Sequence, residues 1–312
     1  MKNKIICIVG PTASGKTGLS IELAKKINAE IISADSMQIY KELNIGTAKV
    51  TKKEAEGIPH HLINICEIDQ KFSVAEFKNM CYDKIEEILQ RGKNVIIVGG
   101  TGLYINSIVY NMNFDEQEID FEYRNYLEDL AKNTSKEEVF KILQEIDPKS
   151  AENIHPNNLK RVIRAIEIAK NSNVLKSEHM ESELKRIEVE ESKYEFLVFN
   201  LVWDREILNE RINKRVDIMM EQGLLEEAKK VYDMNLSKDN TCMQAIAYKE
   251  FFPYFEGKNS LEESIDKLKL ESRKYAKRQV TWFKNKLKTI SLNGEESKEK
   301  LTQDIIKYIN ID

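Results

Sequence analysis

The amino-acid sequence predicts an α/β protein: a doubly wound parallel sheet with a helical insertion domain and a helical C-terminal part. Two observations support this prediction. Short apolar runs, typical of strands buried on both faces of a parallel sheet, alternate with segments of helical periodicity. The first of these runs ends at a glycine-rich loop that leads directly into a helical segment.

The predicted strands are short and apolar, and glycine bounds several of them. After the first strand and its glycine loop, Leu19, Leu23 and Ile27 recur at helical spacing. The fourth strand is rich in aromatic and β-branched residues. The four predicted strands are residues 5–9, 30–32, 95–98 and 194–203.

Between the third and fourth strands, residues 115–194 are predicted to form the helical insertion domain. Residues 1–114 and 195–312 would then form the main domain. Ser135 and Glu138 have the spacing of a capping box, and a second helix follows Pro156. That helix would turn Val162 and its apolar neighbours inward. Residues 171–193 are polar, so we expect a mobile connection there.

Beyond the fourth strand the chain is predicted to be helical. Asp204 is suited to begin one helix as its N-cap, and Gly223 to end it. Ser260 and Glu263 form a capping box at the start of a long final helix.

Composition sets limits on the class of protein. The 312 residues carry a formal net charge of -4, so any polyanionic partner must be met by a local basic patch. The four cysteines lack metal-ligand spacing and are expected to be reduced structural thiols. Neither a signal sequence nor a membrane-spanning run is evident, which favours a cytoplasmic protein without a membrane partner.

The glycine loop matches the P-loop pattern G-x-x-x-x-G-K-[ST] and has the strand and helix that this motif requires. Its backbone N–H groups and the helix N-terminus attract phosphate, Lys16 adds a full charge, and the Thr17 hydroxyl can bind Mg²⁺. The predicted diphosphate-binding residues are Gly10, Pro11, Thr12, Ala13, Ser14, Gly15, Lys16 and Thr17.

The P-loop does not by itself identify the reaction. Nucleotide hydrolases usually carry an acidic residue at the end of a neighbouring strand, where it helps to hold Mg²⁺. Here the strand at 95–98 is followed by Gly99, Gly100 and Thr101. ATP or GTP hydrolysis is therefore disfavoured, although a small-molecule kinase remains open.

Asp35 lies just past the second strand, at the sheet edge where the P-loop also opens. Its carboxylate is a candidate general base toward a nucleophile that attacks the phosphorylated substrate. The alternative is a turn or helix N-cap aspartate without a chemical role.

Basic residues could bind an anionic leaving group. Arg211 and Arg215 share one helix face, but salt bridges to Glu210 or Asp217 would explain them equally well. Residues 267–288 contain nine Lys or Arg and one Glu, which favours a polyanion partner over a solvated face.

His60 and His61 lack acidic or thiol companions nearby in the sequence. We therefore expect structural histidines rather than a metal site.

Seven segments in this order resemble the tRNA dimethylallyltransferases, also called tRNA isopentenyltransferases, over roughly residues 4–288. The resemblance departs at 171–177, where the family often has a Gly- and Pro-bearing turn, and at Ala247, where Gly is common. The segments are GPTASGKT at 10–17, ADSMQIY at 34–40, PHHLI at 59–63, GGTGLY at 99–104, NNLKRVIRAIE at 157–167, AIAYKE at 245–250 and KRQVTWF at 277–283.

The resemblance implies transfer of a dimethylallyl group from dimethylallyl diphosphate to the exocyclic amine of the adenosine just 3′ of a tRNA anticodon. Asp35 would be the base, and Thr101 would orient the carboxylate or the amine. Lys16, Mg²⁺ at Thr17 and either Arg211 or Arg215 would stabilise the departing diphosphate, and the sequence does not say which arginine is closer. The enzyme would act as a monomer on the anticodon stem-loop. The implied tRNA contacts are Asp35, Ser36, Met37, Gln38, Thr101, Arg124, Asn158, Leu159, Lys160, Arg161, Val162, Met243, Gln244, Lys249 and Arg278.

Three other functions remain to be separated from this one. A prenyltransferase acting on a free adenine nucleotide would need the same diphosphate site but little RNA-binding surface. A P-loop kinase would transfer a phosphoryl group from ATP. A non-catalytic RNA-binding module would have no use for Lys16 and Asp35 together.

Overall fold

The computed structural model describes residues 2–114, 120–172, 192–237 and 240–309. The chain divides into two compact units, each described by itself. The core unit comprises residues 1–110 and 192–312, and the insertion unit comprises residues 111–191.

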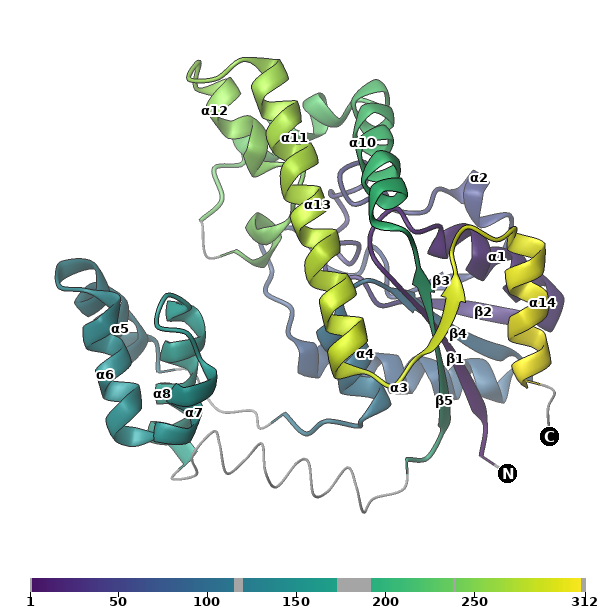
Figure 1. Cartoon of the computed structure of the whole chain (residues 1–312), viewed down its shortest axis with the longest axis horizontal. Helices are drawn as coiled ribbons and strands as arrows, with labels where there is room; N and C mark the ends of the chain where they lie inside the picture. The colour runs from purple at the N-terminus through teal and green to yellow at the C-terminus, as the bar shows by residue number, and fades with distance from the viewer. Residues whose placement is uncertain (1, 115–119, 173–191, 238–239, 310–312) are drawn as a thin grey trace. The chain divides into compact units, whose positions relative to one another are not determined.

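The core unit is built on one parallel sheet, whose described strands run in the order β3-β2-β4-β1-β5-β6 (Figure 1). All the pairings are parallel, which confirms the predicted α/β fold with a doubly wound sheet. The sequence prediction missed β3 and β6, which are short. The strands are β1 Lys4–Val9, β2 Ala29–Ser33, β3 His60–His61, β4 Asn94–Gly99, β5 Glu195–Val202 and β6 Ile290–Asn293.

Helices cover both faces of the sheet, because alternate side chains of each strand point to opposite sides. Ile6 and Ile8 pack with α1 (Lys16–Ile27) and α14 (Lys298–Ile309) on one face. On the other face, Cys7 and its β1 neighbours pack with three helices. These are α3 (Val74–Gln90), α4 (Gly102–Val109) and α13 (Leu261–Lys286).

The predicted helix ends after β5 are confirmed. Asp204 caps its helix by accepting the amides of Glu206 and Ile207, and Gly223 follows it with φ 97°. Ser260 and Glu263 form the reciprocal capping box of α13. The prediction that this is the final helix is wrong, since β6 and α14 follow. The other core-unit helices are α2 Lys52–Ala55, α10 Arg205–Glu221, α11 Leu224–Asp233, α12 Phe252–Phe255 and the 3₁₀ turns Thr241–Gln244 and Lys249–Phe251.

The insertion unit is helical over its described residues and has its own apolar core. Ser135 caps its second helix by accepting the Glu138 amide. Residues 173–191 lie outside the described residues. They include most of the predicted mobile connection and most of the segment 171–177, where the sequence departs from the family pattern. The helices are α5 Phe121–Asn133, α6 Lys136–Ile146, α7 Pro148–Asn153 and α8 Leu159–Ser172.

The four cysteines are buried and free, as expected of structural thiols. Within the described residues, each helix is too short or too polar to cross a bilayer.

Candidate active site

A cavity of about 1350 Å³ opens at the C-terminal ends of β1, β2 and β4, and residues of the core unit line it. Thr12, Asp35 and Gly100, which follow these three strands, are all in its wall. Ligands of such sheets bind at this edge. The volume exceeds the roughly 300–1,000 Å³ of ordinary small-molecule pockets, so there is room for two substrate groups.

The P-loop connects β1 to α1 and is fixed from outside by three distant side chains. Arg211 Nε donates to the Ala13 carbonyl at 2.9 Å, and Trp203 Nε1 donates to the Ser14 carbonyl at 3.1 Å. Gln279 Oε1 accepts the Thr12 amide at 2.8 Å. The loop is therefore preorganised even though Ala13 has the left-handed φ of 62°.

Lys16 stands at the first position of α1 with its ammonium turned into the loop. Nζ donates to the carbonyls of Gly10 and Pro11 at 2.9 and 2.6 Å. The pKa of Lys16 is lowered to about 7, mainly by burial and then by the charge of Arg215, while the charge of Asp35 opposes the shift. A cation held in this way gains from the arrival of an anion.

Asp35 is held in a turn and also lines the cavity. Its Oδ1 accepts the amides of Met37 and Gln38 at 2.9 and 3.4 Å, so it is a turn aspartate. It also lines the cavity together with the P-loop. Among the described residues it forms no ion pair, and its charge acts on Lys16 and Arg215 instead.

Thr101 differs from expectation. Its Oγ1 accepts the Ser36 amide at 3.0 Å and donates to Ser36 Oγ at 3.3 Å, rather than holding the Asp35 carboxylate. It is also not part of the cavity wall. Thr101 therefore fixes the segment that follows Asp35.

The two arginines of α10 occupy different positions beside the loop. The Arg211 guanidinium stacks 4.1 Å from the Trp203 ring and is held by the Ala13 carbonyl. Burial lowers the pKa of Arg215, and the charge of Asp35 opposes that shift. Within the described residues neither arginine pairs with Glu210 or Asp217, and Asp217 instead pairs with Lys269 at 2.6 Å. Arg215 is therefore the arginine that acts on both Lys16 and Asp35.

Most of the residues expected to contact tRNA in the core unit lie in the cavity wall. Thr101 and Met243 are the two exceptions, and Met243 packs against an apolar cluster beside the cavity. Those in the wall are Asp35, Ser36, Met37, Gln38, Gln244, Lys249 and Arg278.

In the insertion unit, the residues expected to contact tRNA differ in their solvent exposure. Asn158, Lys160 and Arg161 are exposed and Leu159 is half-buried. Val162 is fully buried in the unit's own core, so the expectation of a contact by its side chain is wrong.

Arg124 has a structural partner that the sequence analysis did not identify. Its Nε and one terminal nitrogen each donate to the buried Glu167 carboxylate at 2.7 Å. This bidentate pair holds α5 against α8.

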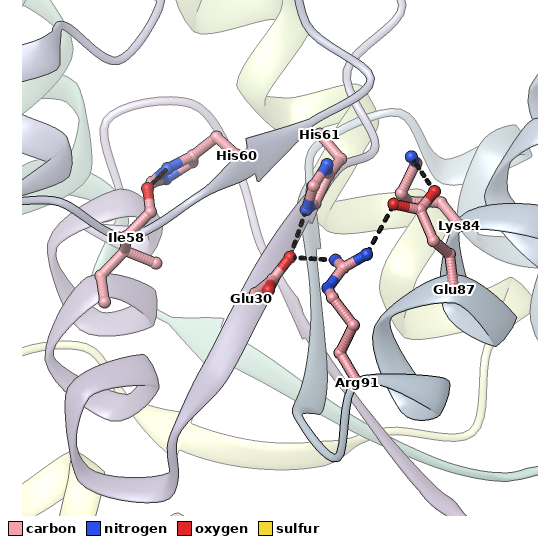
Figure 2. Close-up of polar contacts among 7 residues, drawn as sticks. All are labelled: Glu30, Ile58, His60, His61, Lys84, Glu87 and Arg91. Carbon is pink, nitrogen blue, oxygen red and sulfur yellow. Dashed lines mark hydrogen bonds and ion pairs between the residues drawn. The ribbon is translucent and has the colours of Figure 1, made fainter.

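The histidine pair also has an acidic companion, contrary to the sequence argument. His61 Nε2 lies 2.6 Å from Glu30 Oε2, which Arg91 also contacts at 2.7 Å (Figure 2). Pairing of β3 with β2 brings these residues together at the start of β2, away from the P-loop edge. Three metal-ligating groups do not converge in the described residues, so we interpret this cluster as structural.

The basic stretch on α13 is partly neutralised. Lys269 pairs with Asp217, and Lys267 and Lys274 pair with Glu271. Lys277, Lys284, Lys286 and Lys288 are exposed.

Sequence reasoning missed Gln279 and Trp203 as supports of the P-loop, although Gln279 lies within the quoted KRQVTWF segment. It also missed Glu227, whose carboxylate accepts the amides of Asn44, Ile45 and Gly46 in the cavity wall. These contacts join residues more than 180 positions apart, so local patterns carry no signal for them.

Comparison with known proteins agrees with this geometry. A sequence model of the family described as IPP transferase matches residues 38–286. The tRNA dimethylallyltransferase of Bacillus cytotoxicus is 49% identical over 308 residues, covering 99% of this chain and 95% of the relative.

Two solved structures are also similar. The tRNA delta(2)-isopentenylpyrophosphate transferase of Staphylococcus epidermidis is 45% identical with a TM-score of 0.73, and both chains are covered fully. A eukaryotic dimethylallyltransferase acting on tRNA is 32% identical with a TM-score of 0.84, covering 99% of this chain and 80% of that one.

Proposed function

The chain belongs to the IPP transferase family, and on this premise we propose that its cavity joins a dimethylallyl diphosphate donor to an adenosine of tRNA. The relatives make the chain an enzyme that prenylates tRNA. The finer assignment is transfer to the N6 amine of the adenosine 3′-adjacent to the anticodon.

One observation carries the assignment of roles. The P-loop and Asp35 line the same cavity, and the Asp35 charge acts on both Lys16 and Arg215. On this proposal the Asp35 carboxylate is the base and the P-loop is the anion-binding site, and the cavity that both line is large enough for two substrate groups.

The donor diphosphate would occupy the P-loop at the N-terminus of α1, where backbone amides and Lys16 favour negative charge. Arg215 would stabilise the charge that develops as diphosphate leaves. Arg211 would act mainly through the loop, since its guanidinium is already held by the Ala13 carbonyl and the Trp203 ring.

Asp35 would take the proton that the adenine amine must lose. The N6 nitrogen forms a bond to the allylic carbon, the carbon–oxygen bond to diphosphate breaks, and the diphosphate leaves with that electron pair. Oδ1 is occupied by two backbone amides, so we assign Oδ2 as the proton acceptor. Thr101 would keep this segment in place through Ser36.

The residues present fit a Mg²⁺ ion that is shared with the donor. The Thr17 hydroxyl lines the cavity at the start of α1, and the described residues hold no group of His, Cys, Asp or Glu able to bind a metal alone. Mg²⁺ prefers oxygen ligands and often uses substrate phosphates. When bound, it would neutralise part of the diphosphate charge.

The acceptor tRNA would meet the cavity wall at Ser36, Met37, Gln38, Gln244, Lys249 and Arg278. The exposed Asn158, Lys160 and Arg161 of the insertion unit would contact its backbone. The exposed lysines 277, 284, 286 and 288 of the basic stretch would do the same. The target base must leave its stack to reach Asp35. We further propose that one chain suffices, and that it acts in the cytoplasm.

The test is transfer of label from dimethylallyl diphosphate, in the presence of Mg²⁺, to unmodified tRNA. Parallel reactions use AMP in place of tRNA, and labelled ATP in place of the donor. Label in tRNA alone supports the proposal. Label entering AMP but not tRNA would contradict it in favour of a free-nucleotide prenyltransferase, and phosphoryl transfer from ATP would favour a kinase.

A further inference from the structure

Gln279 on α13 lies between the P-loop and the loop that follows β4. Its side chain is buried, with 6% of the residue exposed. Oε1 accepts the Thr12 amide of the P-loop at 2.8 Å, and Nε2 donates to the Gly100 carbonyl at 2.9 Å. The partners fix the orientation of the amide, because an N–H can only donate and a carbonyl can only accept.

The second of these loops leads to Asp35 by direct contacts. Gly99 packs so closely on Ala34 that a Cβ at Gly99 would lie 2.0 Å from the Ala34 carbonyl oxygen. The Thr101 amide donates to the same carbonyl at 3.3 Å. Gly100 likewise has no room for a side chain, since a Cβ there would lie 2.2 Å from Gln279 Nε2.

These contacts form one continuous path from the phosphate cradle through Gln279 and residues 99–101 to the segment that carries Asp35. The amide side chains of Asn and Gln carry no charge and can accept one hydrogen bond while they donate another. A charged side chain in this position would alter the field at the diphosphate site.

We propose that Gln279 is a positioning residue that sets the separation between the diphosphate cradle and Asp35. The proposal rests on the proposed function and deepens it, because the transfer step needs donor carbon, amine and carboxylate in line. Gln279 lines the cavity, but its Oε1 is held by the Thr12 amide and its Nε2 by the Gly100 carbonyl, so its main effect would be on the two segments that it joins. Loss of its two bonds would loosen the Thr12 amide and, through Gly100, the Asp35 segment.

The test uses Gln279→Met, which keeps the volume and removes both hydrogen bonds. The matched control is Asn106→Leu, which removes the 3.0 Å bond from Trp282 Nε1 on the same helix without touching the P-loop. Calorimetry with inorganic diphosphate and Mg²⁺ reports on the cradle, steady-state kinetics give the donor and tRNA KM values, and thermal melting gives stability.

We expect Gln279→Met to weaken diphosphate binding and raise the donor KM about tenfold, and to lower kcat at saturating donor and tRNA because the Asp35 segment is loosened as well. Asn106→Leu should lower the melting temperature comparably and bind diphosphate like the wild type. The proposal is overturned if Gln279→Met binds diphosphate as the wild type does, or if both variants lose binding in proportion to stability. Absence of tRNA prenylation by the wild type would sink the proposed function, while the diphosphate titration would still decide the role of Gln279.

A second variant covers the case in which Gln279→Met fails to fold. In Gln279→Glu the ionised carboxylate keeps the Thr12 bond but repels the Gly100 carbonyl, whereas the protonated form restores both bonds. Its donor KM relative to the wild type should therefore improve as pH falls from about 8 to about 6, because burial raises the pKa of a carboxyl. A ratio that stays constant over this range would contradict the proposal.

Discussion

Strand β2 leads from one carboxylate to another, and the two have opposite surroundings. Glu30, near its start, has 10% of its side chain exposed and contacts both Arg91 and His61 (Figure 2). Asp35, two residues beyond its end, forms no ion pair with the described residues and lines a cavity with Lys16 and Arg215. The Glu30 charge at the start of the strand is thus paired with basic side chains of the protein. The Asp35 charge beyond its end faces a cavity that could hold a ligand.

The difference separates charges that stabilise the fold from charges to which we assign a chemical role by proposal. Burial opposes ionisation of Glu30, but hydrogen bonds from His61 and Arg91 outweigh it and lower its pKa. Beyond the other end of β2, burial instead lowers the pKa of Lys16 and of Arg215. The charged form of each side chain is therefore less stable there than in water. Such groups in a cavity are typical of functional sites.

The sharpest test of the comparison replaces the carboxylate at the cavity. Asp35→Asn keeps the shape but removes the proton acceptor, so single-turnover transfer to tRNA should fall at least about a hundredfold. Rapid quench with labelled donor measures the rate, and filter binding should show unchanged tRNA affinity. Near-normal transfer would remove Asp35 from the role of base.

Glu30→Gln is the matched change at the other end of β2. It leaves Arg91 and His61 facing a neutral amide, so the free energy of unfolding should fall by about 2 kcal/mol in urea titrations. Transfer measured well below the melting temperature should stay within about twofold of wild type, since no ligand contact is lost. A large loss of transfer without a loss of stability would break the distinction between the two ends.

The pH dependence of the Glu30 contribution has a definite sign. A carboxyl with a lowered folded pKa contributes stability above its unfolded pKa of about 4.3, and this is lost as pH falls through the folded value. The stability gap between wild type and Glu30→Gln should therefore close in acid.

Lys16 should make diphosphate binding depend on pH. Because its pKa is lowered to about 7, we expect the ammonium of the free protein to lose its proton near neutral pH, whereas a bound diphosphate favours the charged form. Above that pH, affinity should fall by up to about tenfold per unit, with proton uptake visible as a buffer-dependent binding enthalpy. In Lys16→Met the pH dependence that comes from Lys16 is absent, and only the titration of diphosphate itself remains. Identical pH profiles of diphosphate affinity for the wild type and Lys16→Met would refute the assignment.

The smallest expected effect concerns backbone strain in the cavity wall. Ala247 has φ 94°, a conformation that glycine adopts without steric cost. Ala247→Gly should raise the free energy of unfolding by about 1 kcal/mol. Unchanged or lower stability in urea would mean that the packing of its methyl group outweighs the strain.

Local patterns in the sequence were enough to predict much of this fold. The P-loop, four of the strands and the caps Asp204 and Ser260 depend on neighbouring residues, and all of them are present. Strand β3 was missed because it consists of two histidines, and two polar residues do not show the alternating or continuous apolar pattern that predicts a strand. It exists because β2 is there to pair with it.

The site was predictable in its residues but less so in its contacts. Asp35 follows a strand on the P-loop side, and that much can be read from order along the chain. The bond of Thr101 to Ser36 and the burial of Val162 depend on packing between segments. The His61–Glu30 contact likewise joins residues 31 apart, a distance over which spacing rules say nothing.

The fixing of the P-loop by Trp203, Arg211 and Gln279 has a consequence for biosynthesis. A nascent chain that has emerged only as far as α4 contains the whole P-loop sequence but none of these three supports. The ribosome must release α13 before the Thr12 amide is held. The P-loop of a stalled or truncated product therefore lacks the side chains that fix its backbone in the finished protein.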